Sequence, residues 1–379
     1  MRFHANRDVF SDAVSFAVRL LPQRTTLPIL SGVLIETTEG GLTLSSFDYE
    51  VSARTQIEAE VLEPGRVLVS GRLLADIANR LPNVPVEVVT DENRVVVSGG
   101  SARFTLLSMP VAEYPSLPVV GEPTGVLPAG VFSPAIAQVV VAASRDDVTP
   151  VITGVQLEAG EDSLALVATD RYRVAIRAVP WHSERSDGGS ALVPARTLQE
   201  VGRTFGSTGD VTISITRGGD RELIAFSSEK KTVTSLLIKG NFPPVRRLFP
   251  DNVDHFAVIG TAELVEATRR VQLVLEREAA LKFTFDADGL GLEAAGGEQA
   301  QASERIDAVL AGEPVVVSLK PQFLLDGLSG VHTEFVRISF TKTENPNKPG
   351  PVLITGQKSR EDTGTEEYRY LLQPNLLLR

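Results

Sequence analysis

A short apolar run, followed by a break and then by apolar residues at helical spacing, occurs three times along the chain. The runs begin at Val67, Ala191 and Val315, and each predicts a strand, a Ser- or Pro-containing break and the start of a helix. The cations that follow the three strands are Arg72, Arg196 and Lys320. Their spacing is 124 residues in both intervals (196 − 72 and 320 − 196). Solenoid repeats run only to about 50 residues, so the pattern predicts a whole domain that is used three times.

Each repeat opens with a second amphipathic segment, in which apolar residues recur at three- and four-residue steps. The predicted helices cover about residues 8–21, 132–143 and 262–275. Short alternating runs separated by turn residues follow and predict antiparallel strands, for example at 32–37, 42–46 and 51–57. Each repeat therefore reads as two helices and about eight short strands, an α+β fold. The expected domains are residues 1–120, 126–250 and 253–379, with Pro- and Gly-rich ordered linkers between them.

The first and second repeats also keep a common register outside the strand–break–helix pattern. Pro28 to Glu36 matches Pro150 to Glu158 at an offset of 150 − 28 = 122 residues. The same offset relates Val9 to Val131 and Asp48 to Asp170. Landmarks this far apart would not hold one offset by chance.

Composition excludes several classes of protein. The 379 residues include no cysteine, so disulfides and thiolate metal sites are absent, as in a reducing cytoplasm. No apolar run approaches the roughly 18 residues of a membrane span, and the N-terminus lacks the apolar core of a signal peptide. The net charge of −11 argues against an open basic surface, but not against one basic face on an acidic molecule.

Few residues are arranged for catalysis or metal binding, and we expect no catalytic group, metal or cofactor. The four histidines lie more than 70 residues apart, so they form no local ligand pair. Asp286 to Gly289 resembles the start of a calcium loop but lacks its later ligands, which favours a hairpin turn, as at Glu39 to Gly41. Ser228 to Lys231 fits a Ser-x-x-Lys pattern without its companion motifs, which favours an exposed turn.

The cations in register are more informative. Arg80 and Arg203 are predicted on the same helices as Arg72 and Arg196, and Arg24 and Arg145 follow the opening helices of repeats one and two. Any one of these cations, taken singly, can be explained as an ordinary charged residue on a solvent-exposed helix face. Three copies in one register favour a shared surface that meets phosphates without reading bases.

Repeat two differs from repeat one where a binding site is expected. It carries Thr169 to Val174, and only this repeat combines that segment with Asn241 to Pro243 and Arg246 to Leu248. Differences between otherwise equal repeats are where a functional site is grafted onto a fold.

At these residues the chain resembles the bacterial DNA polymerase III beta subunit, the sliding clamp, over its whole length. The resemblance is carried by Arg24 to Leu30, Ser45 to Glu50, Ala168 to Arg173 and Phe323 to Leu328, and the Asp-Arg-Tyr-Arg form looks actinobacterial. It implies three tandem clamp domains and a head-to-tail ring homodimer with helices inside, through which double-stranded DNA threads without sequence preference. It also implies a cytoplasmic processivity factor that catalyses nothing and tethers the polymerase III alpha subunit, the clamp loader and other proteins with a clamp-binding motif.

The resemblance also assigns residues. Arg24 and Arg196 match DNA-facing positions, and Phe104 and Leu273 match the dimer interface. Partners of the family insert a short peptide with aliphatic and aromatic anchors between the second and third domains. The matching positions are Ile152, Thr169, Arg171, Tyr172, Arg173, Val174, Pro243, Arg247, Leu248, Leu371, Gln373, Pro374 and Asn375.

The C-terminus departs from the family pattern and leaves alternatives open. Gln373 and Asn375 place amides where apolar side chains line the pocket of the family, and Leu376 replaces the usual arginine. One alternative is a specialised second clamp, tolerant of an inhibitor or restricted in its partners. Two others are a small-molecule enzyme site at Asp170, Tyr172 and Arg173, and a scaffold that binds proteins but never DNA.

Overall fold

The computed structural model describes residues 1–21, 25–185, 189–218, 221–251, 253–276, 279–296, 300–342, 349–365 and 367–376. The chain folds into two compact units, each treated by itself below. Unit 1 comprises Met1–Ser133, Trp181–Asp187 and Arg196–Leu237, and unit 2 comprises Pro134–Pro180, Gly188–Ala195 and Ile238–Arg379. The second repeat therefore contributes to both units.

Two helices form in each repeat, as the apolar spacing predicts. The helices are α1 (Arg7–Arg19), α2 (Gly71–Ala78), α3 (Ala129–Val140), α4 (Ala195–Phe205), α5 (Thr261–Val271) and α6 (Pro321–Ser329). Asn6 caps α1 with its side-chain oxygen, which accepts the backbone N–H groups of Asp8 and Val9. The opening helices of repeats two and three begin and end earlier than predicted, and α5 continues as the 3-10 turn η5 (Gln272–Val274).

Nine strands are described in each repeat, close to the eight expected. Repeat one has β1 (Arg2–Ala5), β2 (Gly32–Thr38), β3 (Gly41–Phe47), β4 (Val51–Glu58), β5 (Glu60–Glu63), β6 (Arg66–Ser70), β7 (Val86–Asp91), β8 (Arg94–Gly99) and β9 (Ala102–Met109). Repeat two has β10 (Gly125–Pro128), β11 (Gly154–Ala159), β12 (Ser163–Thr169), β13 (Arg173–Pro180), β14 (His182–Ser183), β15 (Gly189–Pro194), β16 (Asp210–Thr216), β17 (Leu223–Ser228) and β18 (Lys231–Leu236). Repeat three has β19 (Phe256–Gly260), β20 (Leu281–Asp286), β21 (Gly289–Gly296), β22 (Ala300–Ile306), β23 (Ala308–Ala311), β24 (Val315–Leu319), β25 (Phe335–Phe340), β26 (Val352–Gln357) and β27 (Tyr368–Leu372).

The strand–break–helix pattern is confirmed in all three repeats. Strand β6 leads into α2, β15 into α4 and β24 into α6, each within one or two residues. The hairpins at Glu39 to Gly41 and Asp286 to Gly289 are confirmed, since Thr38 pairs with Gly41 and Asp286 with Gly289. Ser228 to Lys231 is likewise a hairpin turn.

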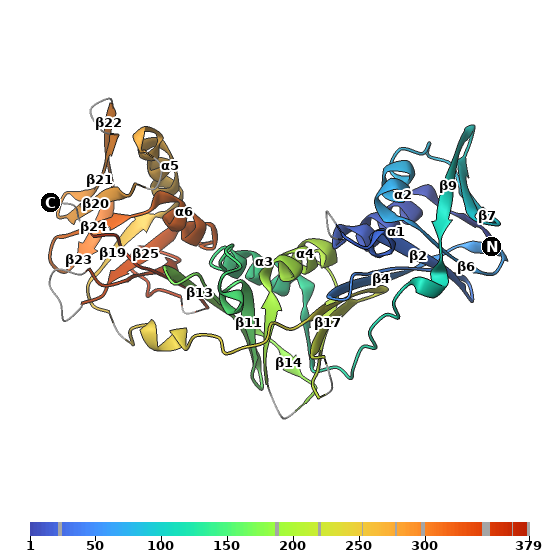
Figure 1. Cartoon of the computed structure of the whole chain (residues 1–379). Helices are drawn as coiled ribbons and strands as arrows, with labels where there is room; N and C mark the ends of the chain where they lie inside the picture. The colour runs from blue at the N-terminus through green and yellow to red at the C-terminus, as the bar shows by residue number, and fades with distance from the viewer. Residues whose placement is uncertain are drawn as a thin grey trace. The chain divides into compact units, whose positions relative to one another are not determined.

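Unit 1 is built on one sheet with the strand order β14-β10-β16-β17-β18-β4-β3-β2-β6-β9-β8-β7-β1-β5. Helices α1 and α2 lie side by side against it (Figure 1). Phe10 of α1 and strand residues such as Val33, Leu44 and Val88 are buried between the helices and the sheet. The apolar faces of both kinds of element therefore meet in one core. Tyr114 orders the first linker, because its hydroxyl accepts the N–H of Phe47 and donates to the carbonyl of Gly32.

Unit 2 contains a sheet with the order β15-β11-β12-β13-β27-β26-β25-β19-β23 and a smaller one with the order β22-β21-β20-β24. Helices α5 and α6 contact each other, and α6 packs on β27 (Figure 1). The close approach requires glycine at position 327, where a Cβ would stand 2.5 Å from the ring of Tyr370.

The two units each join neighbouring repeats in the same way. In unit 1, β4 of repeat one pairs antiparallel with β18 of repeat two. In unit 2, β13 of repeat two pairs antiparallel with β27 of repeat three. Consecutive repeats thus share a continuous sheet through equivalent strands.

Candidate functional site

A tight turn between β12 and β13 presents the polar segment that distinguishes repeat two. The Asp170 carboxylate accepts the backbone N–H groups of Tyr172 (3.0 Å) and Arg173 (3.1 Å). Thr169 accepts the N–H of Arg171 and donates to the carbonyl of Arg173. Arg171 takes a left-handed backbone, with φ of 79°. The turn therefore holds Tyr172 63% exposed on a rigid base.

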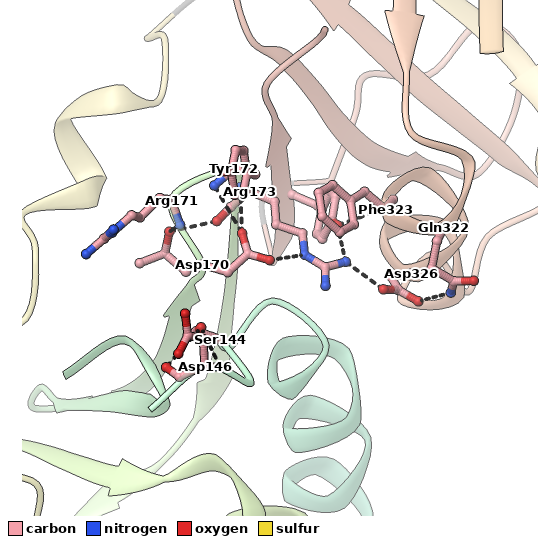
Figure 2. A network of polar contacts seen from close by, with 11 residues as sticks. Ser144, Asp146, Asp170, Arg171, Tyr172, Arg173, Gln322, Phe323 and Asp326 are labelled. Atoms are coloured by element: carbon pink, nitrogen blue, oxygen red, sulfur yellow. Dashed lines mark hydrogen bonds and ion pairs between the residues drawn. The ribbon is translucent and has the colours of Figure 1, made fainter. Parts of the chain in front are cut away.

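Arg173 is the centre of a buried ion network (Figure 2). Its guanidinium donates to Asp170 (2.8 Å), to Asp326 (2.6 Å) and to the hydroxyl of Tyr370 (3.2 Å). Its carbon lies 4.2 Å from the centre of the Phe323 ring. Burial alone would lower the pKa of Arg173, but Tyr370, Asp326 and Asp170 together raise it, so the side chain stays charged. The network fixes the β12–β13 turn against the first turns of α6.

A cavity of about 570 Å³ opens beside this network. It is bounded by the loop after α3, by the turn at Asp170 and by the start of α6. Its lining residues are Ala143, Ser144, Arg145, Asp146, Val148, Thr149, Ile152, Asp170, Arg171, Tyr172, Arg173, Gln322, Phe323 and Asp326. Figure 2 shows Ser144 and Asp146 on one side and Gln322 and Asp326 on the other. The mixed lining suits a peptide with a few polar contacts.

An apolar cluster occupies the joint between β13 and β27 on the same unit. Val174 pairs across the strands with Leu371, and both are buried. Val167, Ile176 and Val245 complete the cluster, and Phe242, Phe249 and Leu353 pack against it. Val245 belongs to the 3-10 turn η4 (Val245–Leu248) of the second linker. This turn leaves Leu248 52% exposed above the cluster, so apolar surface is available there to a partner.

The C-terminal segment after β27 is fixed by alternating backbone hydrogen bonds. Gln373 donates its backbone N–H to the carbonyl of Tyr172 (2.9 Å), and Asn375 donates to that of Ser318 (2.7 Å). The side chain of Gln373 donates to the carbonyl of Pro349 (3.0 Å). Pro374 is buried between them. The amide of Gln373 is thus held by the protein itself.

The structure brings most predicted pocket residues together in unit 2. Ile152, Arg171, Tyr172 and Arg173 line the cavity, and Val174 and Leu371 form the apolar cluster. The Thr169 hydroxyl donates to the carbonyl of Arg173 within the turn, and Gln373 donates its backbone N–H to the carbonyl of Tyr172. The linker supplies Pro243, Arg247 and Leu248.

Sequence reasoning gave no pocket role to Gln322, Phe323 and Asp326, which the structure places at the cavity. Phe323 and Asp326 lie in the Phe323 to Leu328 segment that carried part of the resemblance, and this was the available signal. Val245 and Phe249 of the linker were also missed, and Phe242 lay in the Asn241 to Pro243 segment but was given no pocket role.

The predicted cations fall into two groups. In unit 1, Arg72 and Arg196 are exposed in the first turns of α2 and α4, and Arg203 on α4 pairs with Glu200. Arg80 was predicted on the helix of Arg72, but α2 ends at Ala78 and Arg80 lies in the turn beyond it.

In unit 2, Arg145 lines the cavity, and Lys320 is the N-cap residue of α6 with its ammonium 5.6 Å from the centre of the Phe323 ring. Arg24 lies outside the described residues.

The two predicted interface residues are both exposed on their own units. Phe104 on β9 is 40% exposed, and Leu273 in η5 is 80% exposed. Large apolar side chains that remain exposed on a monomer mark interaction surfaces when they are grouped. Leu107 on the same strand as Phe104 is 71% exposed.

The described residues contain no group of three or more His, Asp or Glu side chains that could hold a metal ion. None of the helices in the described ranges is long and apolar enough to cross a membrane.

Comparisons with known proteins agree over the full length. Models of the N-terminal, central and C-terminal domains of the DNA polymerase III beta subunit match residues 1–118, 126–244 and 246–359. The beta sliding clamp of Streptomyces coelicolor is 45% identical over 376 residues, which cover 99% of both chains. The beta sliding clamp homolog GriR of Streptomyces muensis is 38% identical over 375 residues, again 99% of both. The crystal structure of the Pseudomonas aeruginosa sliding clamp bound to griselimycin superimposes with a TM-score of 0.90 at 26% identity and covers both chains fully. The chain therefore belongs to the DNA polymerase III beta subunit family, the bacterial beta sliding clamps.

Proposed function

We propose that two copies of this chain close head to tail into a ring around double-stranded DNA and tether the replicative polymerase to it. The observation that carries this proposal is the repeated joint. Strands β4 and β18 join repeats one and two, and the equivalent strands β13 and β27 join repeats two and three. The equivalent strands without such a joint are β9 in repeat one and β22 in repeat three. A second copy supplies both missing partners.

Both remaining edges are open in the described part of the chain. Strand β22 pairs only with β21. Strand β9 pairs with β8 over Ala102 to Leu107 and meets β6 only at Ser108 and Met109. Open edges are templates for pairing with another chain. A heterologous contact of this kind closes into a ring when the rotation per repeat permits.

The register of the proposed joint follows from the existing ones. Lys231 pairs with Thr55 in the first joint. By position after the hairpin, Ala102 corresponds to Lys231, and Glu304 corresponds to Thr55. Ala102 is then expected opposite Glu304 of the second copy, and Phe104 opposite Ala302.

This register also accounts for the exposed apolar residues. Phe104 would lie opposite Ala302, whose small side chain leaves room for the Phe104 ring to extend beyond β22. The η5 turn that carries Leu273 packs beside β22. Phe104 of one copy and Leu273 of the other would then be buried together, which removes both from water.

DNA contacts are proposed for the cations at the helix starts. Arg72, Arg196 and Lys320 stand at the beginning of α2, α4 and α6. The further positions are Arg24, Arg80, Arg145 and Arg203. Because a ring holds DNA by topology, these cations need only make weak, sequence-independent phosphate contacts. That agrees with a chain whose total charge is −11.

The cavity and the apolar cluster of unit 2 are proposed to bind partner peptides. The partners are the polymerase III alpha subunit, the clamp loader and other proteins with a clamp-binding motif. We propose further that the protein works in the cytoplasm without catalysing a reaction. Arg173 donates hydrogen bonds to both Asp170 and Asp326, which supports a structural role over the small-molecule enzyme site.

Retention on DNA tests the ring. The protein is loaded by a clamp loader onto nicked circular plasmid, washed in high salt, and the plasmid is then linearised. Salt weakens direct phosphate contacts steeply. Survival of salt on the circle with loss from the linear form is expected. Equal loss from both forms contradicts the proposal.

A second candidate is a specialised clamp with an altered pocket, such as an inhibitor-tolerant copy that serves in antibiotic resistance. The observation in its favour is the C-terminal segment, where Gln373 and Asn375 replace the apolar residues of the family pattern and Gln373 is tied to Pro349. Affinity of a family-type peptide for the protein and for Gln373→Met tests it. Tighter binding to the variant is expected, and equal affinities would exclude this candidate.

A further inference from the structure

The face of the nine-stranded sheet that carries the apolar cluster also carries two arginines in one cross-strand row. Arg337 on β25 pairs with Thr355 on β26, which pairs with Arg369 on β27. Residues directly opposite each other on antiparallel strands point to the same face. Ile176 of the apolar cluster continues this row beyond Arg369.

These two arginines differ from the other arginines that are not fully exposed. Arg7, Arg173 and Arg177 each pair with a carboxylate. Within the described residues, Arg337 and Arg369 have no carboxylate partner. They stack instead on Phe256 (3.3 Å to the ring centre) and Phe249 (5.0 Å). The Nε atom of Arg369 is buried and has no hydrogen-bond partner in the part of the chain that the structure describes.

Arg369 lies directly beside the apolar cluster around Val174 and Leu371, whose surface is called the peptide groove below. Residues two apart on a strand share a face, so Arg369 and Leu371 lie on one face of β27. Leu371 is a member of the apolar cluster. Phe249 packs against the same cluster, and the guanidinium of Arg369 lies over the Phe249 ring. The floor of the groove is thus apolar with a cation at one end. The side chain of Arg369 remains partly exposed there.

We infer that Arg369 is a specificity residue of the groove, which selects partner peptides with an acidic side chain next to their apolar anchors. This inference rests on the proposed partner binding and names one further requirement of the same site. A partly buried guanidinium held flat by an aromatic ring is preorganised for a carboxylate and can bond it in a bidentate manner. Its charge is screened less than that of an exposed arginine.

The surrounding charges favour the same partner. Arg247, on the linker that borders the groove, is exposed, whereas Arg246 next to it is already paired with Glu158. Arg337, which has no carboxylate partner among the described residues, adds a second cation one strand beyond Thr355. This part of the sheet is therefore locally basic on a chain of net charge −11. An acidic flank on the partner complements it.

Peptide affinity tests the inference. The probes are short synthetic peptides with one aliphatic and one aromatic anchor, in which Asp or Asn is placed at each flanking position in turn. Titration calorimetry gives the affinity for the protein, for Arg369→Met and for Arg369→Lys. At one flanking position the Asp peptide is expected to bind roughly ten-fold tighter than the Asn peptide, as one charge-assisted hydrogen bond would give. This advantage should disappear in Arg369→Met and partly return in Arg369→Lys.

A matched control uses Arg360, which also stacks on an aromatic ring but is already paired with Asp307. Arg360→Gln should keep the Asp advantage. If Arg369→Met does not fold, the salt dependence of the two peptides on the unaltered protein decides, because only the Asp peptide should lose affinity as salt rises. Equal affinities of the Asp and Asn peptides, or an advantage that survives in Arg369→Met, overturn the inference and leave partner binding intact. Absence of binding by any peptide contradicts the proposed groove itself.

Discussion

Tyr49 and Arg171 occupy the same place in successive repeats and share a left-handed backbone, with φ of 75° and 79°. In both turns the preceding aspartate, Asp48 or Asp170, accepts the next two free backbone N–H groups. The repeat therefore preserves a strained turn, although the side chains presented by it differ. In repeat two this turn lines the cavity that is proposed to bind partner peptides.

The left-handed position predicts a stability order for substitutions of Arg171. Arg171→Gly should be as stable as the original chain or more stable, by up to about 1 kcal/mol, because glycine adopts positive φ without a steric penalty. Arg171→Val should be less stable by about 1–2 kcal/mol, because a β-branched side chain is disfavoured there. Thermal unfolding of the three proteins measures the order. Equal stability of the Gly and Val variants would contradict it.

The ion network predicts a large effect at Arg173. Arg173→Met leaves the carboxylates of Asp170 and Asp326 buried without their cation, which should lower the free energy of unfolding by about 3 kcal/mol. The variant should also weaken peptide binding, because the turn that carries Tyr172 is no longer fixed. Denaturant unfolding and peptide titration measure both effects.

A double variant, Arg173→Met with Asp326→Asn, serves as the control for Arg173. It should recover part of the lost stability, since one uncompensated charge is removed. A simple sum of the two single effects would show that the network is not coupled.

Tyr114 predicts a dependence of stability on pH in the alkaline range. Burial raises the pKa of Tyr114 to about 12, against about 10 in an unfolded chain. Its contribution is complete below pH 10. Between pH 10 and 12 the unfolded chain releases a proton that the folded chain keeps, so stability falls with rising pH. Tyr114→Phe should lack this part of the decline, up to about 1.4 kcal/mol per pH unit. Urea unfolding of both proteins at pH 9 and pH 11 measures the difference, which would be constant if Tyr114 did not titrate.

The proposed joint between copies predicts that exposed apolar residues hold the dimer. Phe104→Arg or Leu273→Asp should convert the dimer to monomers in sedimentation experiments, because each places a charge where apolar surface would be buried. Leu62 on β5 is exposed to a similar degree as Phe104, at 46%. Leu62→Asp should leave the dimer intact. Dissociation by all three variants alike would argue against the β9–β22 joint.

The helix-start cations predict a graded loss on DNA. Neutralising Arg72, Arg196 and Lys320 together should reduce loading onto circular plasmid and flatten its salt dependence. A control removes the same charge from exposed strand positions, Arg54, Arg66 and Arg94, and should behave like the original chain. A scaffold that never binds DNA would be unaffected by the first triple variant.

Local sequence patterns were sufficient to predict most of the helices and strands. The period of apolar residues predicted α1 and α2 and most strands to within a few residues, because amphipathic spacing decides which face is buried. Helix ends were less accurate, as at Arg80, because the end of a helix depends on packing and capping rather than on periodicity. The position of the groove came from the resemblance together with the difference between repeats.

By itself, the sequence determined the triplicate α+β architecture and the equivalent turns at Asp48 and Asp170. It also determined the cations at the helix starts, Arg72, Arg196 and Lys320. Each of these features is encoded within a short segment. Only the tertiary structure decided which residues those segments contact. It placed Asp326 and Phe323 of α6 on Arg173, 150 residues or more away in the chain, and put Arg369 against Phe249 with no carboxylate partner among the described residues. Such contacts depend on strand pairing between repeats, such as that of β13 with β27. Strand pairing between segments this far apart in the chain depends on how entire sheet and helix faces pack, so local residue spacing does not predict it.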